Sequence, residues 1–252
     1  MLRVEGLSHN FGGIEALVGL DLVIAERDVV GLIGPNGSGK TTLLNMITGI
    51  YKPAAGRIRF RDREISGLEP HEIVTLGISR TFQNLRIYNR MTVSDNVWVA
   101  QHSLPGVGLG ELLLARADNE RRDRAEVERL LELVGLIERR DSLAQDLTLP
   151  DQRRLELARA LVRSPDLLLL DEPAGGMTPV ETGTMAALIR DVALPGRACV
   201  IIEHKMDMIS ALCGRICVLN FGRKIAEGRP DDVLRHPRVL EAYLGMEGMS
   251  HA

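Results

Sequence analysis

Residues 31–47 read GLIGPNGSGKTTLLNMI, and this stretch decides the fold. It begins with an apolar run typical of a buried strand, and it ends with Leu43, Leu44, Met46 and Ile47 at helical spacing. Between the two, residues 34–41 match the pattern GxxxxGK followed by Ser or Thr. A glycine-rich turn between strand and helix lets backbone N–H groups converge on phosphate. The stretch therefore predicts a phosphate-binding loop.

The loop supplies most of the expected nucleotide ligands. Lys40 adds positive charge at the β and γ phosphates, and the Thr41 hydroxyl can bind Mg²⁺. The alternative is a glycine turn with a chance lysine, which the strand and helix on either side disfavour. The residues expected to bind the nucleotide here are Gly34, Pro35, Asn36, Gly37, Ser38, Gly39, Lys40, Thr41 and Thr42.

Apolar runs elsewhere predict the surrounding elements. Short runs at 2–7, 16–24 and 28–33, separated by turn residues, indicate strands, and 56–65 resembles a strand pair. The unbroken runs at 167–170 and 198–202 are typical of strands buried on both faces of a parallel sheet. In 93–140 a helical insert is expected, since Ala125, Val127, Leu130, Leu131 and Val134 recur at helical spacing.

Two carboxylates, Asp171 and Glu172, directly follow the run LLLL at 167–170. Ligands of open α/β sheets bind at the carboxyl ends of the strands. We expect Asp171 to hold the Mg²⁺ shell and Glu172 to orient the water that attacks the γ-phosphate. An Asp-Glu pair alone is more often a solvated strand end, but the phosphate loop makes the catalytic interpretation the stronger one.

The composition excludes some classes of function. With 31 Lys plus Arg against 34 Asp plus Glu, the chain has no broad basic field for nucleic acid or an anionic membrane. No window approaches the ~18 apolar residues of a membrane-spanning helix, and the N-terminus lacks a secretory signal pattern. Cys199, Cys213 and Cys217 form no paired metal pattern and suit a reducing cytoplasm. We expect Cys213 and Cys217 to be small buried residues on one helix or its exit.

The order of the motifs GPNGSGKTT, RTFQNL, QRRLELARAL, LLLLDEP and VIIEHKMDM resembles the ATPase subunits of ABC transporters. The resemblance spans nearly the whole chain, residues 1–252. It implies an α/β P-loop ATPase with an antiparallel β subdomain, a catalytic core at about 1–84 and 162–252, and a helical subdomain at about 85–161. It also implies that Gln83 joins the Mg²⁺ site, that His204 contacts the γ-phosphate, and that Phe11 stacks on adenine.

The segments FGGIEAL, RTFQNLRIYNRMTVSDNV and HPRVLEAYLG resemble the subgroup that serves branched-chain or hydrophobic amino-acid importers. The resemblance implies ATP and Mg²⁺ as cofactors and a position on the cytoplasmic face of the membrane. The implied partners are permease subunits, a second ATPase subunit in a heterodimer or homodimer, and indirectly a solute-binding protein. No nucleic acid is expected.

The signature segment departs from this family. Where the family has LSGGQ, this chain has Leu147 followed by Thr148, Leu149, Pro150 and Asp151. In the family this segment caps the partner's ATP, but Pro150 has no N–H to donate and Asp151 adds a negative charge. The segment still makes a good helix start, with Thr148 as N-cap. Thr178 is a second departure, since relatives carry Asp or Asn there.

Other interpretations remain open at this point. An envelope-lipid exporter ATPase would share every core motif. A regulatory ABC ATPase with low turnover would suit the degenerate signature, although Lys40, Glu172 and His204 are intact. A soluble ABC ATPase acting on DNA or ribosomes usually has two cassettes or long inserts, and this chain has neither.

Overall fold

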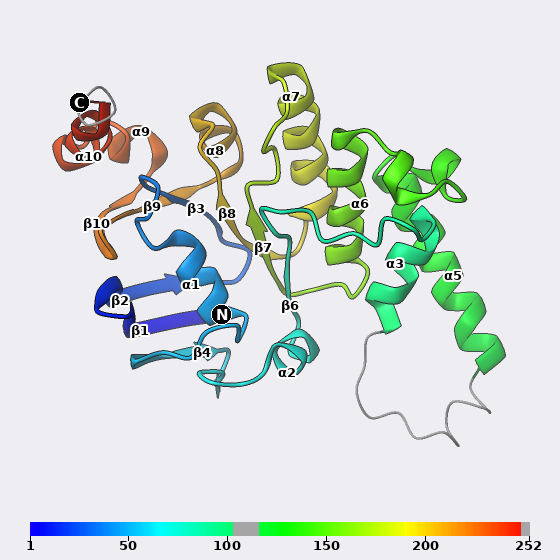
Figure 1. Ribbon diagram of the computed structural model, residues 1–252, viewed down its shortest axis with the longest axis horizontal. Helices are drawn as coiled ribbons and strands as arrows, with labels where there is room; N and C mark the ends of the chain where they lie inside the picture. Colours follow the sequence, from blue (N-terminus) through cyan, green and yellow to red (C-terminus); the bar gives the residue numbers. More distant parts are fainter. Residues whose placement is uncertain (103–115, 248–252) are drawn as a thin grey trace.

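The computed structural model describes residues 1–102 and 116–247, and its strands form two sheets (Figure 1). The smaller sheet is antiparallel, with the order β2-β1-β4-β5. It therefore confirms the expected antiparallel subdomain. Its strands are β1 (Leu2–Phe11), β2 (Ile14–Ile24), β4 (Ala55–Phe60) and β5 (Arg63–Glu64).

The larger sheet has the order β10-β9-β3-β8-β7-β6, and its strands are parallel except for the β9–β10 pair. Because the strands are parallel, the carboxyl ends of β3, β7 and β8 lie at one edge, where the candidate site is built. The strands are β3 (Val29–Ile33), β6 (Ile78–Arg80), β7 (Leu167–Asp171), β8 (Ala198–Ile202), β9 (Arg215–Asn220) and β10 (Arg223–Gly228).

Apolar cores cover both faces of the larger sheet. Along β7, Leu167 and Leu169 pack toward α1 (Lys40–Ile47) and the smaller sheet, whereas Leu168 and Leu170 pack with the helices of the opposite face. Figure 1 shows α1 and the smaller sheet on one side and α7 and α8 on the other. The other core helices are α2 (Pro70–Thr75), α7 (Pro179–Leu188) with the π-helical η3 (Ile189–Ala193), α8 (Met206–Leu212), α9 (Pro230–Val233) and α10 (Pro237–Glu247).

Among the described residues, the expected helical subdomain contains three helices that contact one another: α3 (Val93–His102), α5 (Arg116–Leu133) and α6 (Leu149–Leu161). Short 3-10 turns, η1 (Ile137–Arg139) and η2 (Ala144–Asp146), connect α5 to α6. The predicted apolar face of α5 is buried except for Ala125, which is exposed. Part of the expected insert, residues 103–115, lies outside the described residues, and the subdomain boundaries stay a prediction.

The cysteines are buried as expected, but they do not share a helix. Cys213 caps the C-terminus of α8, and Cys217 lies within β9. Because β9 begins at Arg215, shortly after α8 ends at Leu212, the spacing of four places Cys213 at the end of the helix and Cys217 in the strand. In the part of the chain that the structure describes, no helix is both long and apolar enough to cross a membrane.

Candidate functional site

The phosphate-binding loop joins β3 to α1, and two of its glycines are required by close backbone contacts. A Cβ at Gly34 would lie 2.1 Å from the Leu219 carbonyl oxygen, and one at Gly39 would lie 2.6 Å from that of Ala16. Gly39 also has a φ of 102° immediately before α1 begins. These positions exclude side chains, so the loop is fixed against its neighbours.

Lys40 is the first residue of α1, and its ammonium group is folded back onto the loop. Its Nζ donates to the carbonyl oxygens of Gly34 (2.8 Å) and Pro35 (2.9 Å). Burial lowers the pKa of Lys40, while the nearby carboxylates of Glu172 and Asp171 oppose that shift. The loop therefore places a buried positive charge next to two carboxylates.

Asp171 ends β7 and Glu172 follows it, but the two side chains have different surroundings. Asp171 is buried, and its side chain lies on the α1 face of the sheet. Glu172 has a φ of 50°, in the left-handed region that non-glycine residues seldom adopt. This turn separates the two neighbouring carboxylates, and Glu172 lines the cleft beside the phosphate loop.

Three predicted residues from distant parts of the chain meet at the Glu172 carboxylate. Gln83 Nε2 donates to Glu172 Oε2 at 3.1 Å, and His204 Nε2 lies 3.2 Å from Glu172 Oε1. Gln83 follows β6 and His204 follows β8, the neighbours of β7 in the sheet. The parallel order of the strands therefore brings all three side chains to one edge.

These side chains and the phosphate loop enclose a cleft of about 350 Å³. The cleft holds a lysine ammonium, backbone N–H groups and one carboxylate, which together suit a polyphosphate and an attacking water. It is lined by Ala16, Asn36, Gly37, Ser38, Gly39, Lys40, Thr41, Thr42, Gln83, Glu172 and His204.

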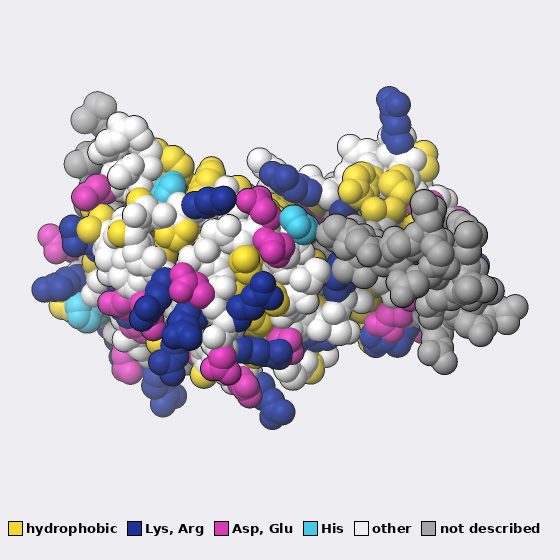
Figure 2. Space-filling view, turned by 90° about the horizontal axis from the view of Figure 1, so that it is seen from below, with side chains coloured by type: hydrophobic (Ala, Val, Ile, Leu, Met, Phe, Trp, Pro, Cys, Tyr) yellow, Lys and Arg dark blue, Asp and Glu magenta, His cyan; other side chains and the backbone are white. Residues whose placement is uncertain are grey.

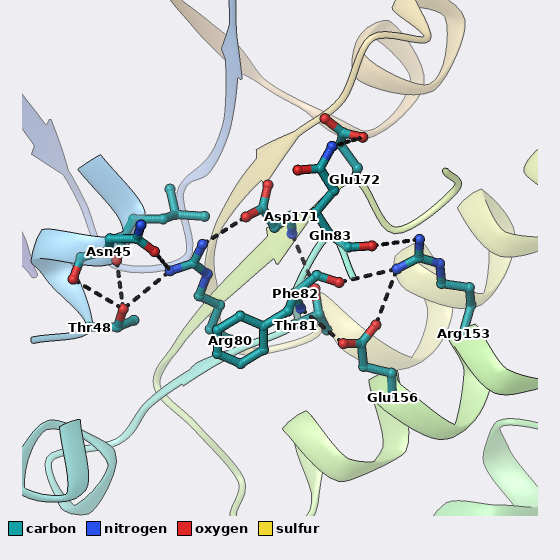
Figure 3. A network of polar contacts seen from close by, with 11 residues as sticks. Asn45, Thr48, Arg80, Thr81, Phe82, Gln83, Arg153, Glu156, Asp171 and Glu172 are labelled. Carbon is teal, nitrogen blue, oxygen red and sulfur yellow. Dashed lines mark hydrogen bonds and ion pairs between the residues drawn. The ribbon is translucent and has the colours of Figure 1, made fainter. Parts of the chain in front are cut away.

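A buried polar network behind the cleft was not predicted from the sequence (Figure 3). Arg80 donates to Asp171 Oδ2 (2.8 Å) and to Asn45 Oδ1 of α1 (2.7 Å). On α6, Arg153 donates to the carbonyl oxygens of Phe82 (3.2 Å) and Gln83 (2.9 Å). The network thus joins α1, the end of β7 and α6 through the segment that carries Gln83.

Two further buried carboxylates fix the backbone around the site. Glu156 of α6 accepts a hydrogen bond from the Phe82 N–H (3.0 Å), and burial raises its pKa. Glu203 accepts from the backbone N–H groups of Ala174 (2.9 Å) and His204 (2.9 Å). Glu203 directly follows the buried apolar strand β8. A charged residue at the end of such an apolar run is the sequence signal that could have identified Glu203 as a site residue.

Besides Gly34, Pro35 and Asp171, two groups of predicted residues do not line the cleft. Phe11 lies at the end of β1, where its ring contacts those of His9 (4.6 Å) and Tyr51 (5.2 Å). The signature segment begins α6, with Thr148 as the predicted N-cap accepting from the Asp151 N–H. The adenine-stacking role of Phe11 and the phosphate role of residues 148–151 both stay predictions.

Thr178 is the N-cap of α7, as Thr148 is of α6. Its side chain accepts from the Glu181 N–H, and Glu181 accepts from the Thr178 N–H, which together make a capping box at the start of α7. The departure from Asp or Asn at this position therefore preserves the start of the helix.

A phosphate loop between strand and helix, with two carboxylates at the end of a parallel strand, defines the class of P-loop nucleotide hydrolases. Comparison with known proteins narrows this class. The model of the ABC transporter family matches residues 17–175, and that of a branched-chain amino acid ATP-binding cassette transporter matches residues 223–245. The chain belongs to the ABC transporter ATP-binding family and is an ATPase.

Curated relatives match along nearly their full length. The high-affinity branched-chain amino acid transport ATP-binding protein LivG of Salmonella typhimurium is 42% identical over 251 residues, covering 97% of this chain and 98% of the relative. BraF of Pseudomonas aeruginosa, with the same description, is 40% identical over 249 residues, at 97% and 98% coverage. A crystal structure of an ABC transporter cassette in its ADP conformation has a TM-score of 0.85 and 33% identity, covering 97% of this chain and 98% of that one.

Proposed function

We propose that this chain is the ATP-hydrolysing subunit of an importer for branched-chain amino acids. The observation that carries the proposal is the Glu172 carboxylate, which Gln83 and His204 hold beside the phosphate loop. The substrate class rests on the relatives, since LivG and BraF are named for branched-chain amino acid transport. These relatives do not favour an envelope-lipid exporter or a regulatory ATPase.

ATP binds with its phosphates against the loop of residues 34–42. The backbone N–H groups and the N-terminus of α1 favour negative charge there. Lys40 contributes its ammonium, whose bonds to Gly34 and Pro35 show how near it lies to the loop. Phe11, at the tip of the β1–β2 hairpin, is our candidate for adenine stacking.

The residues near the loop fit a magnesium ion. Asp171 Oδ1 is buried and has no hydrogen-bond partner among the described residues, so it is available to a cation. Thr41 and Gln83 line the cleft beside it and would complete the protein ligands. No cluster of three acidic, histidine or cysteine ligands exists in the described part of the chain, which suits an ion held mainly by phosphate and water oxygens. When bound, Mg²⁺ neutralises charge on the β and γ phosphates.

Glu172 orients and polarises the attacking water. Its two oxygens contact Gln83 Nε2 and His204 Nε2, which fix the carboxylate without burying it completely. His204 also lines the cleft, where its ring can contact the γ-phosphate. Hydrolysis then depends on positioning and charge, as in other phosphoryl transfers.

Transport requires partner subunits. We infer that the chain binds permease subunits on the cytoplasmic face of the membrane and pairs with a second ATPase subunit, with a solute-binding protein acting indirectly. On the face seen in Figure 2, basic and acidic side chains are interspersed, so no single-sign field dominates that face. Recognition there must be local.

The degenerate signature makes the two ATP sites of the assembly unequal in our proposal. ATP bound by this chain meets Lys40, Glu172 and His204 and the partner's signature. ATP bound by the partner faces residues 148–151 of this chain, where Pro150 offers no N–H. The site that this chain builds should carry most of the turnover.

Reconstitution tests the proposal. The chain is purified with its permease and ATPase partners, placed in proteoliposomes with the solute-binding protein, and supplied with Mg-ATP and leucine. Leucine-dependent uptake coupled to ATP hydrolysis is expected. Hydrolysis that no branched-chain amino acid stimulates would contradict the importer assignment.

A further inference from the structure

Arg80 ends β6, and the register of the sheet places its side chain beside Asp171. Arg80 lies opposite Leu169 of the parallel strand β7, and Asp171 is two residues beyond Leu169. Side chains two apart along a strand share a face. Leu169 packs on the α1 side, so both Arg80 and Asp171 belong to that face.

The guanidinium group joins two elements that carry the phosphate site (Figure 3). One nitrogen donates to Asp171 Oδ2 at 2.8 Å, at the end of β7. The other donates to Asn45 Oδ1 of α1 at 2.7 Å and to Thr48 Oγ1 at the C-cap of this helix at 3.3 Å. A planar fork with fixed donors can serve acceptors on both elements at once, whereas a lysine ammonium is a single point charge.

Stability alone does not explain this ion pair. The side chains of Arg80 and Asp171 are only 4% and 1% exposed. Removing both charges from water costs so much that a buried pair often contributes no more than apolar residues of the same volume. The ion pair at the end of β7 therefore needs a further explanation, and its contacts with both β7 and α1 point to a positional role.

The two oxygens of Asp171 have different environments. Oδ2 is held by Arg80, while Oδ1 is buried with no hydrogen-bond partner among the described residues. The Asp171 backbone N–H donates to Thr81 Oγ1 at 3.1 Å, which fixes the main chain as well. With main chain and Oδ2 both held, the direction of Oδ1 is set before any ligand arrives.

We propose that Arg80 is a positioning residue that orients Asp171 Oδ1 toward the magnesium ion and keeps β7 in register with the helix of the phosphate loop. This inference rests on the proposed nucleotide site. Asn45 lies on the helix that begins with Lys40 and Thr41. Through Asn45 and Asp171, Arg80 fixes the distance between the Thr41 and Asp171 ligands without touching the nucleotide.

The test separates magnesium-dependent binding from binding as such. The affinity of the full chain for ADP is measured by calorimetry in excess MgCl₂ and again in EDTA, and the ratio of the two affinities is the readout. Arg80→Gln is expected to reduce this ratio about tenfold, equivalent to about 1.4 kcal/mol. The affinity in EDTA should stay within about twofold of wild type, because the phosphate loop is unchanged.

Arg86→Gln is the matched control. Arg86 lies over the same Phe82 ring as Arg80, with its Cζ 4.5 Å from the ring centroid compared with 4.9 Å for Arg80, but it is exposed. The control should keep the wild-type ratio. Should Arg80→Gln fail to fold, Asn45→Ala removes the α1 anchor without unpairing the buried carboxylate, and it should reduce the ratio about threefold.

Three outcomes would contradict the inference. Wild-type affinity in both buffers for the folded Arg80 or Asn45 variant would show that the guanidinium does not position the metal ligand. An equal loss of affinity in MgCl₂ and in EDTA would show a merely structural role. A tenfold loss in the Arg86 control would assign the effect to the Phe82 ring. If wild type binds no ADP in either buffer, the proposed nucleotide site itself is wrong.

Discussion

Replacing Glu172 by Gln tests the central catalytic assignment with little disturbance of the structure. The carboxylate has two neighbours, Gln83 Nε2 at 3.1 Å and His204 Nε2 at 3.2 Å. A Gln side chain has the same shape, and its carbonyl oxygen can accept from Gln83 while its NH₂ group faces His204. The cleft should therefore keep its geometry, and only the negative charge that polarises water is lost.

The expected loss is kinetic. General-base positioning is worth ~10²- to 10⁴-fold in rate, which corresponds to about 2.7–5.4 kcal/mol in the activation barrier. Turnover at the ATP site built by this chain should fall at least about a hundredfold, so the reconstituted transporter should keep only the smaller activity of the partner's site. Nucleotide affinity should change less than about threefold, because the phosphate loop and Lys40 are unchanged.

The assay compares phosphate release with calorimetric binding of Mg-ATP for wild type, Glu172→Gln and Glu64→Gln. The last variant makes the same chemical change on the exposed strand β5 and should retain wild-type turnover. Near wild-type turnover in Glu172→Gln would remove Glu172 from the catalytic role. A matching loss of ATP affinity would instead mean that the carboxylate organises the phosphate loop.

Lys40→Ala should weaken ATP binding about ten- to a hundredfold in calorimetry, since a hydrogen bond to a charged group contributes about 1.5–3 kcal/mol; unchanged affinity would refute the assigned loop. Burial raises the pKa of Cys213 to about 12, so at pH 8 the native thiol should resist a disulfide reagent that labels it after unfolding in guanidinium chloride, and rapid native labelling would show that α8 opens. Replacing Leu149 and Pro150 by Gly and Asp151 by Gln should raise turnover at the partner's ATP site about tenfold, measured with Glu172→Gln silencing this chain's own site. No gain would mean that the segment already reaches phosphate.

The sequence predicted those parts of the fold that depend on local patterns. The run at 167–170 was expected to be a strand buried on both faces, and β7 is buried along its length. Thr148 was expected to cap a helix and does so, because Ser or Thr followed three residues later by an acid is a local signal. The division of the helical subdomain into separate helices was harder to predict, because Leu- and Arg-rich stretches show a helical period without showing where one helix ends and the next begins.

The buried network illustrates the opposite case. Arg80 and Asp171 are 91 residues apart, and a lone arginine beside a strand gives no sign of its partner. Arg153 and Glu156 are three apart on α6, a spacing that usually indicates a solvated ion pair. Here both are buried against the backbone of Phe82 and Gln83. Gln83 was expected only through the family resemblance, and the side chains that fix its backbone were missed.

The two adjacent carboxylates show why the site could be predicted only in part. The sequence places Asp171 and Glu172 at the end of one strand, and two adjacent residues of an ideal strand would point to opposite faces. The strand period alone would therefore place Glu172 on the face of the sheet that α7 and α8 cover, away from the phosphate loop. Instead, its φ of 50° ends the strand and turns the side chain into the cleft, where Gln83 and His204 hold it. A residue in this region costs about 1–3 kcal/mol and persists only where its surroundings enforce it. The strain at Glu172 therefore supports the proposed function, in which both carboxylates serve one nucleotide, Asp171 from behind the loop and Glu172 from within the cleft.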